Sequence, residues 1–78
     1  MKEEMTPQTF VLRPYTKAEL AHRYLPKYTH RVAMRKFNYW LRYSPLLWDR
    51  LVATGLTIRN AELSYEQVRI IIGYLGEP

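Results

Sequence analysis

Residues 29–43 contain the pattern that most restricts the fold, because they separate into two opposed faces when wound as an α-helix. The apolar residues of this stretch follow the spacing i, i+4, i+7 and i+8: Ala33, Phe37, Trp40 and Leu41. The polar residues, mostly cationic, follow the spacing i, i+4, i+7 and i+11: Arg31, Arg35, Asn38 and Arg42. With Thr29 as the expected N-cap, the sequence predicts a helix over about residues 30–43 that buries the first set and exposes the second.

Two capping boxes mark the beginnings of two further helices. Thr16 and Glu19 form a T-x-x-E box, and Ser64 and Gln67 form an S-x-x-Q box. In such a box the N-cap hydroxyl and the side chain three residues later each accept a hydrogen bond from the other's backbone N–H. The first helix is expected to end near residue 24, because Pro26 cannot continue it. The last helix shows apolar residues at i, i+3, i+4 and i+7: Val68, Ile71, Ile72 and Leu75.

A fourth helix is expected between Ser44 and Gly55. Ser44 is its predicted N-cap, and Pro45 follows at the first helical position, where its missing N–H costs nothing. Gly55 stands where a glycine ends a helix, as Gly76 does for the last helix. Gly73 lies inside that last helix at a cost of about 1 kcal/mol relative to alanine, so we expect close packing at this position.

The expected fold is all-α, a small helix-turn-helix-like bundle of about four short helices. A chain of 78 residues fits one domain, which buries only about 60% of the surface of its unfolded chain. We expect a flexible tail at residues 1–9 and a single helical domain at residues 10–78. Residues 10–12 are a candidate extended segment, and residues 56–63 form either a small hairpin or a loop anchored by two side chains.

Positive charge is concentrated in residues 13–42. This stretch holds one acidic residue and eight basic ones, a net charge of +7: Arg13, Lys17, Arg23, Lys27, Arg31, Arg35, Lys36 and Arg42. The other residues hold four basic and six acidic side chains, so the formal net charge of the chain is +5. A local basic field attracts polyanions such as nucleic acid. The alternative is that the charge serves only the solubility of a small basic protein.

Residue sets for catalysis and metal binding are missing from the sequence. It contains no cysteine, so disulfides, thiolate metal ligands and thiol nucleophiles are excluded. The histidines, His22 and His30, lack the H-x-x-x-H spacing and a nearby carboxylate cluster, and the three glycines form no phosphate-binding loop. We therefore expect no enzymatic activity, no metal and no cofactor.

The hydropathy pattern shows no membrane segment. No apolar run approaches the roughly 18 residues that a membrane-spanning helix needs. Residues 1–9 are polar and lack the apolar region of a signal peptide. We expect a cytoplasmic protein that does not enter a membrane.

A helix, a short connection and a second helix with a basic outer face are the outline of a helix-turn-helix DNA reader. Arginine can bind guanine, and asparagine adenine, through two hydrogen bonds, and lysine neutralises phosphates. The sequence therefore predicts binding of double-stranded DNA. The residues expected to face the groove are Arg31, Arg35, Asn38 and Arg42, and those expected to face phosphates are Lys27 and Lys36. The connection at residues 25–28 contains Pro26 and no glycine, so the sequence does not set the angle between the helices.

Two alternatives explain the same residues without DNA. In one, the chain is a protein-interaction module that docks an acidic partner or a second copy of the domain. Its contacts would be the arginines together with three tyrosines, Tyr28, Tyr39 and Tyr43. In the other, the basic side is an ordinary solvated helix face, because arginine and lysine stems cover apolar surface. Trp40 and Trp48 are expected to anchor the core rather than to bind a ligand.

Two motifs carry a resemblance to a known family. They are E-L-A-x-x-Y-x-P at residues 19–26 and the ending Y-L-G-E-P at residues 74–78. From Arg13 to Pro78 the chain resembles small uncharacterised bacterial proteins from gut anaerobes, which are classed as a domain of unknown function. This resemblance implies a free-standing single domain and brings no established activity.

A looser similarity concerns K-x-E-L-A at residues 17–21, followed by a helix that ends in Trp40-Leu41. This arrangement is similar to the helix-turn-helix of excisionase and MerR-type regulators, in which such a helix pair reads DNA. The similarity implies a small regulator or an accessory factor of a mobile element. It places four residues on the reading helix: Arg31, Arg35, Asn38 and Arg42.

Overall fold

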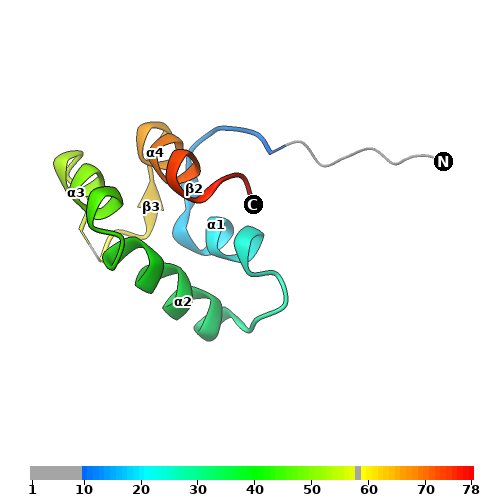
Figure 1. The fold of residues 1–78 in the computed structure, drawn as a ribbon. Helices are drawn as coiled ribbons and strands as arrows, with labels where there is room; N and C mark the ends of the chain where they lie inside the picture. Colours follow the sequence, from blue (N-terminus) through cyan, green and yellow to red (C-terminus); the bar gives the residue numbers. More distant parts are fainter. Residues whose placement is uncertain (1–9, 58) are drawn as a thin grey trace.

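The computed structural model describes residues 10–57 and 59–78, which form four helices and a two-stranded antiparallel sheet (Figure 1). In chain order the elements are β2 Tyr15–Thr16, α1 Lys17–Tyr24, α2 His30–Arg42, α3 Pro45–Ala53, β3 Glu62–Leu63 and α4 Tyr65–Leu75. The prediction of a mostly helical bundle with four short helices is confirmed. The tail expected at residues 1–9 lies outside the described residues, and so does Ile58.

Both capping boxes form as predicted. Thr16 Oγ1 accepts a hydrogen bond from Glu19 N at 3.0 Å, and Glu19 Oε1 accepts one from Thr16 N at 2.9 Å. At the start of α4, Ser64 Oγ accepts from Gln67 N at 3.2 Å, and Gln67 Oε1 accepts from Ser64 N at 2.8 Å. These paired hydrogen bonds satisfy backbone donors that a helix leaves without partners in its first turn.

The start of α3 differs in one detail from the prediction. Ser44 occupies the N-cap position, but its side chain makes no capping hydrogen bond. Instead, Ser44 Oγ donates to the carbonyl oxygen of Trp40 at 2.8 Å. The last carbonyls of α2 lack partners within their own helix, so the hydroxyl satisfies an acceptor of α2 rather than a donor of α3.

The end of α3 follows the expected glycine rule. Gly55 has a φ of +96°, which an L-residue with a side chain rarely adopts. Its N–H donates to Val52 O at 2.9 Å, and the N–H of Leu56 donates to Leu51 O at 3.2 Å. These two bonds form a Schellman motif, which reverses the chain and buries the side chain of Leu56.

The sheet joins two segments that are far apart in the sequence. Instead of forming a local hairpin in residues 56–63, β3 pairs with β2, with Tyr15 opposite Leu63 and Thr16 opposite Glu62. Tyr15 and Leu63 are also the residues that precede the two capping serine and threonine positions, and both are buried. The pairing removes both side chains from water at the point where the segments before α1 and α4 meet.

The core is formed by one side of each helix together with the sheet. In Figure 1, α2 lies along one edge of the molecule, packed against α1 and α3, while α3 packs against α4. The side chains with no exposed surface include three from α2: Ala33, Phe37 and Leu41. The residues Trp40 and Trp48 pack against this core but stay half-buried. The predicted inner face of the second helix is therefore confirmed at Ala33, Phe37 and Leu41, while its fourth residue, Trp40, is only half-buried.

Tyr24 ties the end of α1 to the end of the chain. Its ring stacks on Phe37 at a centroid distance of 6.0 Å and meets Trp40 edge-on at 6.1 Å. Its hydroxyl donates a hydrogen bond to the carbonyl oxygen of Gly76. Burial, with a smaller effect from the nearby Glu77 carboxylate, raises the pKa of Tyr24 to about 12.

This pKa predicts that the protein loses stability in alkaline solution because of Tyr24. A tyrosine in an unfolded chain has a pKa of about 10. The folded state therefore holds the phenolic proton more tightly, and its advantage is complete below about pH 10 and is lost as the pH rises toward about 12. Urea unfolding at several pH values measures this loss. We expect the free energy of unfolding of the Tyr24→Phe variant to fall less between about pH 10 and pH 12 than that of the wild type. An equal alkaline loss in both proteins would contradict the assignment, since the other tyrosines are shared.

The expectation of close packing at Gly73 is wrong. A β-carbon placed there meets no other atom within 4 Å, and the position is exposed. Gly73→Ala is therefore expected to raise the free energy of unfolding by about 0.5–1 kcal/mol, because alanine favours the helix and restricts the unfolded chain. The measurement is urea unfolding followed by circular dichroism.

Gly55→Ala is the matched control for this prediction. A β-carbon at Gly55 also meets open space, but the φ of +96° is strained for alanine. The same substitution should therefore lower the free energy of unfolding there, by about 1 kcal/mol. If both substitutions change the free energy of unfolding in the same direction, the backbone conformation of the glycine does not determine the sign of the effect.

Candidate nucleic-acid interface

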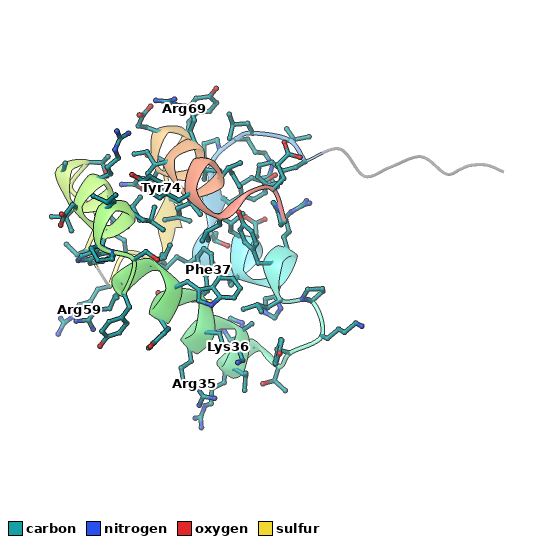
Figure 2. All side chains as sticks on the ribbon, viewed as in Figure 1. Arg35, Lys36, Phe37, Arg59, Arg69 and Tyr74 are labelled. Carbon is teal, nitrogen blue, oxygen red and sulfur yellow. The ribbon has the colours of Figure 1, made fainter. Side chains whose placement is uncertain are left out.

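The outer side of α2 is set by the three residues that the helix buries. An α-helix turns by about 100° per residue, so the side opposite Phe37 is centred between Arg35 and Tyr39. Both of these residues are exposed, and so are Arg31 and Arg42 beside them. We call these four residues the α2 stripe: Arg31, Arg35, Tyr39 and Arg42. Figure 2 shows Arg35 pointing away from the molecule, on the other side of the helix from Phe37.

The guanidinium groups of the α2 stripe are not neutralised within the described part of the chain. Residues 20–48 contain no acidic residue at all. The nearest acid on the preceding helix, Glu19, caps Thr16 and lies 4.0 Å from Arg13. Glu66 binds Arg69 at 2.6 Å on α4. Among residues 10–57 and 59–78, no ion pair involves an arginine of α2, so these cations face solvent.

Asn38 lies at the border of the α2 stripe rather than within it. The side chain is half-buried, and its Oδ1 is buried without a hydrogen-bond partner in the described structure. It faces a groove between α2 and residues 59–61. The spacing i, i+7 from Arg31 grouped Asn38 with the arginines, but this position is closer than Arg31 to the buried residues of the helix.

Of the two lysines expected at phosphates, one lies on the flank of α2 and the other lies before this helix. Lys27 is exposed in the connection between α1 and α2. Lys36 is half-buried, and its Nζ lies 5.1 Å from the centre of the Tyr28 ring. This cation–π contact restricts the position of the ammonium group. The structure therefore spreads the six predicted contact residues over the outer side of α2, both of its borders and the connection that precedes it.

Tyrosines add an aromatic component to this surface. The rings of Tyr39 and Tyr43 lie 4.6 Å apart, and 61% and 64% of these side chains are exposed. The Arg42 guanidinium lies 5.9 Å from the centre of the Tyr43 ring. As the sequence predicts, Tyr39 lies beside the basic residues, and it lines a pocket together with Arg35 and Lys36.

The structure also brings together two histidines that the sequence separates. His22 Nε2 and His30 Nδ1 lie 3.2 Å apart, and the rings are stacked with centroids 5.4 Å apart. This contact joins α1 to the first residue of α2, and one N–H···N hydrogen bond requires at least one neutral ring.

Within the described ranges, no cluster of three or more histidine or carboxylate side chains has the arrangement of a metal site. In the same residues, no helix has the length and apolar character of a membrane span.

These features define a small, mostly helical domain with a basic helix on its surface. The chain belongs to the family described as Domain of unknown function (DUF4248), whose family model matches residues 11–78. No curated protein and no solved structure matches the sequence. The predicted membership of a family of unknown function is confirmed, and the family brings no activity with it.

The two sides of α2 should differ sharply in their contribution to stability. Arg31→Ala and Arg35→Ala are each expected to change the free energy of unfolding by no more than about 0.5 kcal/mol, because these side chains are exposed and unpaired in the described structure. Phe37→Ala removes a ring with no exposed surface and should cost about 3–5 kcal/mol. Denaturant unfolding measures both. A loss above about 1 kcal/mol in either arginine variant would show that the stripe has a structural role.

Proposed function

We propose that this protein binds double-stranded DNA through the outer side of α2. The observation that carries the proposal is the α2 stripe, in which Arg31, Arg35 and Arg42 face solvent without a neighbouring acid. The opposite side of the same helix is completely buried at Phe37, so the helix holds these cations in a fixed direction. A surface helix with a rigid apolar back and projecting donors is what a groove-reading helix requires.

The dimensions and chemistry of α2 agree with this role. Its 13 residues span about 20 Å, and the major groove is about 12 Å wide, so the helix can lie in the groove while its ends meet the backbone. Arginine can bind guanine or a phosphate through two hydrogen bonds. Tyr39 supplies a hydroxyl and an aromatic face beside Arg35. Asn38 contributes from the border of the stripe.

The neighbouring elements fit a helix-turn-helix unit. α1, the connection at residues 25–29 and α2 follow one another as the two helices of such a unit do. Lys27 in the connection and Lys36 on the flank of α2 are positioned to neutralise phosphates. The similarity to excisionase and MerR-type regulators supports the same role. We infer a cytoplasmic regulator or mobile-element accessory factor without catalytic activity.

The exposed aromatic pair favours a second candidate function. Tyr39, Tyr43 and Leu46 are all more than half exposed and follow one another from α2 to α3. Aromatic residues and arginine are enriched in the centres of protein interfaces. An acidic protein or a second copy of the domain would match this surface. Duplex binding with a steep salt dependence favours the first candidate, because it reports displaced counterions.

The decisive variant is the double substitution Arg35→Ala/Arg42→Ala. We expect wild-type protein to bind a labelled random-sequence duplex at low salt, with an affinity that falls steeply as salt is added. Each lost phosphate contact reduces the slope of log K against log salt by about 0.9, so the double variant should lose up to about 1.8 of slope. Fluorescence anisotropy at several salt concentrations measures both quantities.

Arg50→Ala/Arg69→Ala is the matched control, since it removes the same charge from exposed residues of α3 and α4. Figure 2 shows Arg69 on the other side of the molecule from Arg35. This control should retain most of the affinity and the full salt slope. Equal losses in the two double variants would show that only net charge matters. Absence of duplex binding by the wild type would exclude the proposed function.

A further inference from the structure

A groove lies beside the α2 stripe, between α2 and the turn that precedes β3. Its volume is about 440 Å³. None of the described residues that line it is acidic, and they include Lys17, Asn38 and Arg59. Figure 2 shows Arg59 and Arg35 projecting from the same side of the molecule. The groove is therefore a continuation of the basic surface of α2.

The position of Arg59 is fixed from both directions along the chain. On one side, Asn60 Oδ1 accepts hydrogen bonds from Thr57 N at 2.9 Å and Thr57 Oγ1 at 2.7 Å. On the other side, the carbonyl oxygen of Ala61 accepts a hydrogen bond from Lys17 N at 2.8 Å, directly before β3 pairs with β2. These bonds hold the turn against the start of α1, with the Arg59 side chain exposed.

Two basic residues line the groove, Lys17 at the start of α1 and Arg59 in the turn before β3. Lys17 is 2% exposed, and burial lowers the pKa of its ammonium group. The first turn of α1 also lines the groove, and its N–H groups carry partial positive charge.

Asn38 lines the groove on the side of α2. Its Oδ1 is buried without a hydrogen-bond partner in the described structure, and its amide nitrogen is the atom of this side chain that can donate to an anion. A phosphate oxygen would accept from this nitrogen while Arg59 binds it from the opposite wall.

We propose that this groove receives a phosphate group of the DNA backbone and that Arg59 is the residue that binds it. The proposal rests on the proposed function and extends it, since a duplex on the α2 stripe would pass one strand over the groove. Phosphate contacts at the flank of a reading helix set the register and orientation of the protein on the duplex. A free phosphate ion offers the same chemistry, so the test must separate the two sources.

The test compares Arg59→Ala with wild type in duplex binding by fluorescence anisotropy. We expect the affinity to fall roughly tenfold, as for loss of a hydrogen bond to a charged group. The slope of log K against log salt should decrease by about 0.9. Arg59→Lys should keep most of the slope because it keeps the charge. Arg50→Ala, an exposed arginine of α3, is the matched control and should change neither quantity.

The outcomes distinguish this proposal from the one on which it rests. If wild type binds duplex and Arg59→Ala behaves like Arg50→Ala, the groove does not hold a phosphate, while binding by α2 stands. If wild type does not bind duplex, both proposals are wrong. Titration with inorganic phosphate, followed by backbone amide NMR shifts at residues 59–61, forms the second arm. Saturation by free phosphate without duplex binding would assign the groove to a small anion and overturn the DNA assignment.

Discussion

The burial of one side of α2 is the constraint on which the rest of the structure depends. Ala33, Phe37 and Leu41 have no exposed surface, and together they determine the rotation of the helix about its axis. Every other side chain of α2 then points in a direction set by its distance in sequence from these three. The exposed arginines are therefore a consequence of core packing. A surface of this kind is rigid without needing contacts among its own charges.

A second constraint joins the ends of the fold. The domain contains no disulfide, so its N-terminal and C-terminal parts are held together by packing and hydrogen bonds alone. Tyr15 and Leu63 meet in the two-stranded sheet, and each directly precedes a capping box. The same pairing fixes the turn that carries Arg59 beside the start of α1. The buried pair Tyr15 and Leu63 thus helps to determine where the exposed side chain of Arg59 lies.

Local features of the chain were predictable from the sequence. The capping boxes of α1 and α4, the glycine at the end of α3 and the inner face of α2 depend on residues within one or two helical turns of one another. Features that depend on residues far apart in the chain were not predictable from the sequence. The pairing of β2 with β3 arises from two segments separated by α1, α2 and α3, and no local pattern marks it.

The candidate site shows the same division. The exposure of Arg31, Arg35 and Arg42 follows from helical periodicity, and the structure agrees with it. The border position of Asn38 follows from the exact direction of the core, which spacing between polar residues does not contain. Arg59 was not predicted as a site residue, because a single arginine in a loop belongs to no sequence pattern. Its place beside α2 results from tertiary packing, and no local rule anticipates it.

We propose that the outer side of α2 is the surface that meets DNA. The most direct test is a duplex titration followed residue by residue through backbone amide NMR shifts of the labelled protein. If α2 meets the duplex, the largest changes fall on four residues: Arg31, Arg35, Tyr39 and Arg42. Changes concentrated on α4 around Arg69, or no changes at any duplex concentration, would contradict it.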